Sequence, residues 1–229
     1  MAKITNLTKK WGNRSIFDGF TLELEENKIT AILGKSGIGK STLLSCISNL
    51  TSFDGKIEGF GNISYVFQEH RLIENLTVKQ NLEYVLGGAI KDKNAVNEVI
   101  ARVLDITKLK NLQNKQVKTL SGGEKQRATL ARAFAYPSQS ILLDEPFNSL
   151  DLGLKNSIMS DFRTLFETFP KTCVFVTHSV DEALFLSDNI YFLEANRAQY
   201  IGSVSGERKY GYEENDTLRR KLYELLFKE

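Results

Sequence analysis

The segment with the clearest chemistry is GKSGIGKST at residues 34–42, which fits the pattern G-x-x-x-x-G-K-[ST]. Glycines let such a loop wrap around a phosphate, the lysine brings positive charge to the β- and γ-phosphates, and the hydroxyl can coordinate Mg²⁺. A strand-like apolar run, ITAIL, precedes the loop, and a helical pattern follows it. We therefore expect a nucleotide phosphate site made by Gly34, Lys35, Ser36, Gly37, Gly39, Lys40, Ser41 and Thr42.

A second glycine-rich turn lies in LSGGEKQR, residues 120–127. A Ser-Gly-Gly turn that leads into a helix presents unpaired backbone N–H groups and the positive end of the helix dipole to an anion. Taken alone, the same residues are equally typical of a well-capped helix.

Two adjacent carboxylates end the apolar run ILLDE at residues 141–145. Asp144 is placed to hold Mg²⁺ through its water shell. Glu145 is placed to accept a proton from an attacking water, which favours hydrolysis over transfer to a bound acceptor. The alternative for Glu145 is that it only caps or pairs at the end of the strand.

The elements that must position these residues alternate between strand and helix. Residues 140–144 and 172–177 are apolar runs typical of strands buried on both faces of a parallel sheet. Between Thr77 and Phe134 the apolar period is helical, which indicates a helical insertion between strands. The alternation predicts an α/β fold with a parallel sheet, followed by an amphipathic helix near the C-terminal end.

Composition narrows the class of protein. The 30 Lys and Arg nearly balance the 28 Asp and Glu, which argues against nucleic acid as the main partner. The chain shows neither the apolar run of a signal peptide nor 18 uninterrupted apolar residues, so we expect a cytoplasmic protein that spans no membrane. Cys46 and Cys173 lie in apolar surroundings without CxxC spacing, and we expect both to be buried and reduced.

The order of P-loop, LSGGEKQR, ILLDEP and VTH resembles that of the ATP-binding cassette (ABC) ATPases, over essentially the whole chain. LSGGEKQR is similar to the signature sequence of that family, and ISYVFQE to the strand that leads into the Q-loop, with Gln68 as its glutamine. NSLD resembles the D-loop, with Asp151, and VTHSVDEA the switch segment, with His178. The resemblance implies one nucleotide-binding domain over residues 1–229: a P-loop NTPase core with a parallel sheet, an N-terminal antiparallel β-subdomain and an inserted helical subdomain at about 72–134.

The resemblance also implies a purpose for the second glycine-rich turn, because subunits of this family pair head to tail. Ser121, Gly122 and Gly123 would contact the γ-phosphate held by the partner's Lys40, so that ATP joins two protein faces and hydrolysis releases them. Asp151 is expected to belong to the same nucleotide-contacting set.

The remaining site residues also follow from the resemblance. Gln68 would help to hold the metal, and Gln68 and His178 would sense the metal, the water and the γ-phosphate; the alternative for His178 is a satisfied core histidine. The family stacks adenine on an aromatic ring about two dozen residues before the P-loop, commonly a tyrosine, and Trp11 is the aromatic residue available here. The alternative for Trp11 is packing under the β-subdomain.

Several features are similar to importer cassettes. FQEHRLIENLTVKQNLEYV and EPFNSLD resemble segments of the ATPases of nitrate, sulfonate and taurine importers, although Ile73-Glu74-Asn75 replaces a frequent L-P-W. We expect Mg²⁺-dependent ATP hydrolysis, separate integral membrane permease subunits, a homodimer or paired cassette, a solute-binding protein, and a position on the inner face of the cell membrane.

Two other functions remain open at this point. One is a regulatory or mechanotransmitting cassette that works with a cell-division or lipoprotein-release membrane complex. The other is a P-loop kinase, against which both Glu145 and LSGGEKQR speak.

Overall fold

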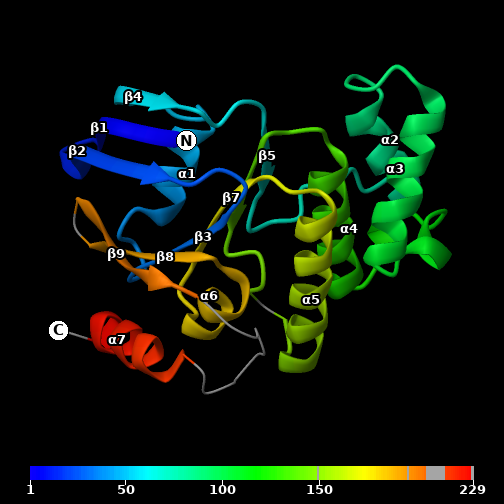
Figure 1. Cartoon of the computed structure of the whole chain (residues 1–229). Coiled ribbons are helices and arrows are strands. Elements are labelled where there is room, and N and C mark those ends of the chain that lie inside the picture. The colour runs from blue at the N-terminus through cyan, green and yellow to red at the C-terminus, as the bar shows by residue number, and fades with distance from the viewer. Residues whose placement is uncertain (149, 195, 205–214, 228–229) are drawn as a thin grey trace.

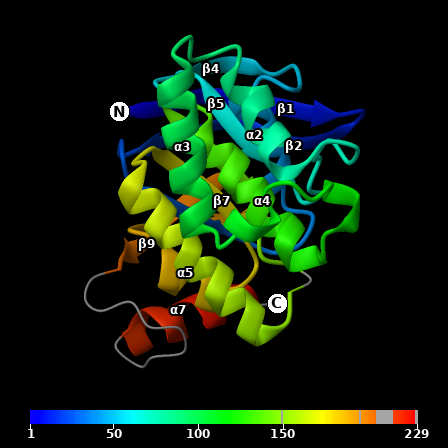
Figure 2. The same cartoon turned by 90° about the vertical axis from the view of Figure 1, so that its right-hand side faces the viewer.

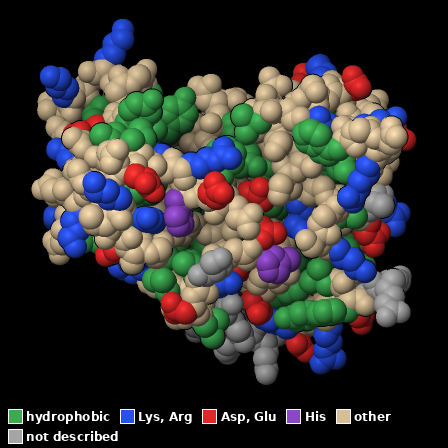
Figure 3. All heavy atoms as spheres, turned by 180° about the vertical axis from the view of Figure 1, so that it is seen from behind, with side chains coloured by type: hydrophobic (Ala, Val, Ile, Leu, Met, Phe, Trp, Pro, Cys, Tyr) green, Lys and Arg blue, Asp and Glu red, His purple; other side chains and the backbone are tan. Residues whose placement is uncertain are grey.

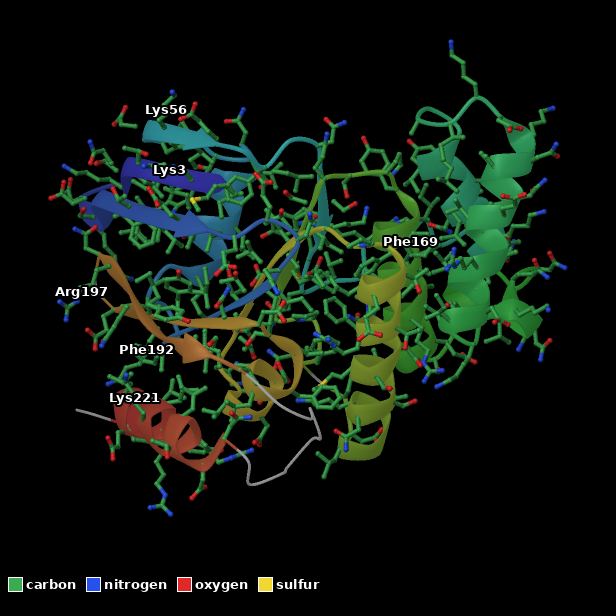
Figure 4. All side chains as sticks on the ribbon, in the orientation of Figure 1. Lys3, Lys56, Phe169, Phe192, Arg197 and Lys221 are labelled. Atoms are coloured by element: carbon green, nitrogen blue, oxygen red, sulfur yellow. The ribbon has the colours of Figure 1, made fainter. Side chains whose placement is uncertain are left out.

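The computed structural model describes residues 1–148, 150–194, 196–204 and 215–227, and its first strands form an antiparallel sheet. Strand β1 (Ala2–Trp11) lies at the centre of this sheet, between β2 (Arg14–Leu24) and β4 (Asp54–Glu58). Alternate residues of β1 and β2 are buried, as expected for a sheet with one face on the core. Figure 4 shows the long side chains of Lys3 on β1 and Lys56 on β4 at this sheet, where each pairs with a glutamate.

A second sheet of six strands, in the order β5-β6-β7-β3-β8-β9, forms the centre of the molecule (Figure 1). Its strands from β5 to β8 are parallel, and β9 closes the edge in the antiparallel direction. The strands are β3 (Ile29–Leu33), β5 (Ile63–Val66), β6 (Ser140–Asp144), β7 (Thr172–Thr177), β8 (Asn189–Glu194) and β9 (Arg197–Ser203). Every residue of β3 and β7 is buried, because helices or the first sheet cover both faces of these strands.

Helices surround the parallel strands on both sides. They are α1 (Lys40–Ile47), α2 (Val78–Leu86), α3 (Lys93–Ile106), α4 (Gly122–Ala135), α5 (Leu152–Thr168), α6 (Val180–Leu186) and α7 (Asp216–Phe227), with short 3₁₀ turns at Lys110–Leu112 and Val117–Thr119. Helices α3, α4 and α5 run side by side in Figure 2, with α2 against α3 and α4. Helix α7 packs at the opposite end, against α6 and β9 (Figure 1), through Leu222, which is fully buried.

These elements confirm the predicted fold class, a P-loop type α/β core with an antiparallel β-sheet and additional helices. The C-terminal amphipathic helix is also confirmed, as are two buried, unpaired cysteines at Cys46 and Cys173. Over the described part of the chain, none of the helices combines the length and the apolar character that a membrane span requires.

Candidate nucleotide-binding site

The sheet register brings four chain segments together at one edge. Leu33 of β3 pairs with Thr177 of β7, and Val176 of β7 pairs with Asp144 of β6. Since these strands are parallel, the residues that follow them meet at the carboxyl end of the sheet, where α/β folds place their ligands. The P-loop, the Asp144-Glu145 pair, His178 and, beyond β5, Gln68 therefore converge although they are far apart in the sequence.

Lys40 organises the P-loop from within. Its side chain is 6% exposed, and its Nζ donates hydrogen bonds to the carbonyl oxygens of Gly34 at 2.8 Å and Lys35 at 3.1 Å. Burial lowers the pKa of Lys40 from its ordinary value, against the opposing charges of Glu145 and Asp144. A buried ammonium whose hydrogen-bond acceptors are neutral carbonyl oxygens is stabilised more strongly by an anion. A phosphate group is such an anion.

Gly39 is required by both backbone and space. Its φ is +114°, and a Cβ at this position would lie 2.6 Å from Cγ2 of Ile16. Gly39 is also the N-cap of α1, so the loop delivers its free N–H groups directly to the start of that helix.

A cavity of about 420 Å³ opens in front of this loop. It is lined by Trp11, Arg14, Ile16, Ser36, Gly37, Gly39, Lys40, Ser41, Thr42, Gln68 and Glu145. Gly34 and Lys35 lie behind the lining and contribute their carbonyl oxygens to Lys40. The predicted phosphate-binding residues thus meet the predicted base-stacking residue across one cavity.

Trp11 is 54% exposed at the end of β1, which does not fit the alternative that it packs beneath the β-sheet. The Nζ of Lys9 lies 4.2 Å from the centroid of the indole ring. Hydrogen bonds to Oγ1 of Thr51 at 2.7 Å and to the carbonyl oxygen of Ser52 at 2.6 Å fix that ammonium. Together these contacts hold the indole ring at the cavity edge.

Asp144 and Ser41 form a small oxygen-rich cluster. The Ser41 hydroxyl donates to Oδ1 of Asp144 at 2.9 Å. Burial raises the pKa of the Asp144 carboxyl, as does the charge of Glu145, while the hydrogen bond from Ser41 and the charge of Lys40 oppose the rise. Such a carboxylate lacks a full counter-charge, which a divalent cation supplies.

The donor set fits Mg²⁺. A hydroxyl, a carboxylate and the amide oxygen of Gln68 are hard oxygen ligands, and Mg²⁺ takes few protein ligands because it keeps waters and binds phosphate oxygens. Among the residues that the structure describes, no three His, Cys, Asp or Glu side chains gather to hold a metal by themselves.

Glu145 adopts a left-handed backbone conformation, with φ at +45°. Its backbone N–H donates to the carbonyl oxygen of Val176 at 3.1 Å, which ties it to β7. The Oε2 of Glu145 accepts a hydrogen bond from Nδ2 of Asn148 and lies 3.4 Å from Nδ1 of His178. His178 has a 55% exposed side chain, so the alternative of a satisfied core histidine does not describe it.

Figure 3 shows the face of the molecule that points away from the viewer in Figure 1. The two histidine side chains of the chain both lie on it, with acidic side chains between them.

The lining of this cavity includes neither Asp151 nor any residue of the second glycine-rich turn. Ser121 is the N-cap of α4 and forms a capping box with Glu124, while Gly122 and Gly123 make the first turn of the helix. Asp151 caps α5, accepting a hydrogen bond from the N–H of Leu154 at 3.0 Å. Ser149, which completes the NSLD segment, lies outside the described residues.

Sequence reasoning missed four residues at the site, namely Arg14, Ile16, Tyr65 and Asn148. Arg14 lines the cavity and donates to the carbonyl oxygen of Gly37 at 3.1 Å. The Nδ2 of Asn148 donates to Oε2 of Glu145, and burial together with the charge of Asp144 raises the pKa of the Tyr65 hydroxyl. No sequence pattern marks Arg14 or Tyr65, whereas Asn148 follows Glu145 by three residues and could have been proposed as its partner.

Comparison with known proteins gives a consistent result. The family model described as "ABC transporter" matches residues 17–148. The sulfate/thiosulfate import ATP-binding protein CysA of Mesostigma viride is 36% identical over 211 residues, which cover 87% of this chain and 61% of the relative. The protein of the same name from Nocardia farcinica is 34% identical, with 89% of this chain and 65% of the relative covered. The chain thus spans about three fifths of the length of these curated relatives.

Solved structures agree with the sequence relatives. The ATP-binding cassette MJ0796, solved as a dimer in a post-hydrolysis state bound to ADP and Pi, superposes with a TM-score of 0.76 at 27% identity, covering 90% of this chain and all of that one. An inward-facing metal-chelate type ABC transporter gives a TM-score of 0.77 at 28% identity, covering 96% of this chain and 88% of its own.

Proposed function

This chain belongs to the ABC transporter family, and from that premise we propose that it is an ATP-binding and ATP-hydrolysing cassette that works as a head-to-tail dimer. The observation that carries the proposal is the separation of two anion-binding segments on one chain. One, the P-loop, lines a cavity together with Glu145; the other, at the start of α4, contributes no residue to the lining of that cavity. In a dimer with two-fold symmetry, the start of α4 of each copy would lie at the cavity of the other copy.

The proposed roles follow from the contacts. Lys40 exchanges its carbonyl partners for the β- and γ-phosphates, and Ser36, Gly37, Gly39 and Thr42 surround them. Trp11 stacks on the adenine. Glu145 accepts the proton of the attacking water, while Asn148 and His178 hold the carboxylate in place. Ser121, Gly122, Gly123 and Asp151 act on the nucleotide of the partner subunit.

Ser41, Asp144 and Gln68 would hold Mg²⁺ in this proposal. When bound there, the ion would neutralise charge on the phosphate oxygens. The attacking water would be oriented by Glu145, His178 and Gln68.

We propose an importer as the wider assembly, because the curated relatives are described as import ATP-binding proteins. Membrane permease subunits, a solute-binding protein and a position on the inner face of the cell membrane belong to this proposal. Residues of about 72–134, which include α2, α3 and α4, would form the helical subdomain of a single nucleotide-binding domain over residues 1–229.

The experiment that tests the proposal measures phosphate release from Mg-ATP without any acceptor. The unaltered chain is expected to release phosphate, and Lys40→Ala to lose nucleotide binding or turnover because the cavity loses its buried cation. Lys79→Ala, which removes a surface lysine from α2, is the matched control and should behave like the unaltered chain. Full activity of Lys40→Ala would refute the proposed phosphate site, and turnover only with an acceptor would indicate a kinase.

A further inference from the structure

The start of α5 packs directly against the second glycine-rich turn. A Cβ at Gly123 would lie 2.5 Å from Cδ2 of Leu154, so the glycine allows the first turn of α4 to rest on the first turn of α5. A rigid, close-packed contact of this kind transmits displacement rather than absorbing it. Any movement of the turn at Gly123 therefore reaches Leu154.

Lys155, the next residue of α5, joins the same turn to the segment around His178. Its Nζ lies 2.7 Å from Oε1 of Glu182 on α6, with side-chain exposures of 17% and 2%. The other oxygen, Oε2, accepts a hydrogen bond from the Thr177 hydroxyl at 2.6 Å. Oγ1 of Thr177 in turn accepts a hydrogen bond from the N–H of Ser179 at 3.0 Å.

Thr177 and Ser179 flank His178 on both sides, so the Glu182 carboxylate fixes the backbone that carries this histidine. Ser179 is also the N-cap of α6, with its hydroxyl accepting from the N–H of Glu182 at 3.3 Å. A carboxylate buried to this degree needs its cation, because an unpaired charge in the interior is strongly destabilising. The position of the Thr177–Ser179 segment is thus coupled to Lys155.

We propose that Lys155 and Glu182 are positioning residues for His178, through which the turn at Gly123 controls the distance between His178 and Glu145. Neither side chain lines the nucleotide cavity. The inference rests on the proposed function, in which Gly123 contacts the nucleotide of the partner subunit and His178 that of its own. Each copy then carries an internal link between the two ATP sites of the dimer.

The test compares Lys155→Met with Lys155→Arg and with a matched control, Lys108→Met. Lys108 also pairs with α5, at 2.8 Å from Oδ1 of Asp161, but away from His178. We expect Lys155→Met to lower kcat for ATP about 10- to 100-fold with KM within about twofold, because the reacting groups are misplaced while the nucleotide contacts stay. Lys155→Arg should recover most of the turnover, and Lys108→Met should match the unaltered chain.

A second readout needs no hydrolysis. Only two histidines are present, so the ring resonances of His178 and His70 can be assigned by NMR with a His70→Gln variant. Lys155→Met is expected to shift the His178 resonance, and Lys108→Met to leave it in place. Should Lys155→Met not fold, Glu182→Gln breaks the same ion pair by removing its negative charge and keeps an acceptor for the Thr177 hydroxyl.

The outcomes separate the two proposals. An unaltered chain that releases no phosphate contradicts the proposed function, whatever the variants do. An active unaltered chain with an equally active Lys155→Met or Glu182→Gln, and an unmoved His178 resonance, overturns the positioning link alone. Equal losses of kcat in Lys155→Met and Lys108→Met would show that the ion pair of Lys155 and Glu182 only supports α5 in general. That result would also overturn the positioning link.

Discussion

At the scale of single residues, the proposed chemistry depends most on Glu145. Its Oε2 contacts two neighbouring side chains, the amide of Asn148 and the ring of His178. Its backbone N–H is hydrogen-bonded to β7. A left-handed φ at a glutamate costs conformational energy that the surrounding structure must balance. This combination is expected of a side chain held in one position for proton transfer.

Glu145→Gln is predicted to bind Mg-ATP but to release phosphate at least about 100-fold more slowly, the scale of a lost general base. Glutamine keeps the shape and the acceptor for Asn148 but has little basicity. Phosphate-release assays with Glu83→Gln as control check this, since Glu83 pairs only with Lys79 on the surface of α2 among the contacts described. Turnover like that of the unaltered chain would remove Glu145 from its proposed role.

Trp11 gives a second prediction at this scale. Because it is the only tryptophan, saturating ATP should quench or shift the intrinsic fluorescence of the chain. Trp11→Ala should weaken ATP binding by about 1–3 kcal/mol, or roughly fivefold to 150-fold, the range for base stacking on an aromatic ring, whereas Trp11→Tyr should retain most of it. Unchanged fluorescence at saturation, together with an unchanged Kd in Trp11→Ala, would exclude the stacking role.

Lys171 lies outside the site and gives a prediction about stability. It is 5% exposed, and its Nζ donates to the carbonyl oxygens of Tyr136 at 2.8 Å and Ser138 at 3.0 Å. Burial lowers its pKa to about 8. Lys171 therefore binds its proton less strongly in the folded chain than in the unfolded chain between about pH 8 and the ordinary lysine pKa of about 10.4, and its contribution to the free energy of unfolding should rise with pH in that window.

The contribution of Lys171 to this rise is at most about 1.4 kcal/mol per pH unit. Lys171→Met should make the slope of the free energy of unfolding against pH less positive than in the unaltered chain, and urea unfolding of both at several pH values between 8 and 10 measures the difference. Lys56→Met, which removes a surface lysine from β4, is the control and should keep the slope. A variant at position 171 with the slope of the unaltered chain would contradict the assignment.

At the scale of elements, sequence patterns predicted the strands, loops and helix caps that depend on residues close together in the sequence. Four of the five residues of β3 are apolar and a glycine loop follows them; this run and those of β6 and β7 identified the strands and hence the P-loop and the carboxylate pair. The capping box at the start of α4 could also be predicted, because Ser121 and Glu124 stand three residues apart.

Contacts between distant elements could not be predicted in the same way. The pair of Lys155 and Glu182 depends on how α5 packs against α6, and the contact between Gly123 and Leu154 depends on how α4 crosses α5. Arg14 reaches Gly37 only because β2 passes beside the P-loop. Charge and spacing in one sequence carry no information on these tertiary neighbours, since each of the residues is also typical of a solvated helix or strand.

At the scale of the whole molecule, the arrangement is incomplete as a single copy. The cavity is lined by the P-loop, Gln68 and Glu145, but neither the turn at Ser121 nor the cap at Asp151 contributes to its lining. In the proposed dimer, two copies related by a two-fold axis would supply both sets to both sites, and ATP would then join the copies. The opening and closing that hydrolysis would drive is therefore a property of the pair rather than of the chain.

One complementation measurement tests this most directly. Lys40→Ala damages the P-loop and Ser121→Arg damages the second turn, so each variant alone should release almost no phosphate. In a mixed dimer, one site combines the intact P-loop of one copy with the intact turn of the other, so an equal mixture should recover activity, up to about a quarter of the intact sites for random pairing of two-fold dimers. A mixture no more active than the sum of the two separate variants, or Ser121→Arg alone retaining full turnover, would contradict a nucleotide site shared between two copies.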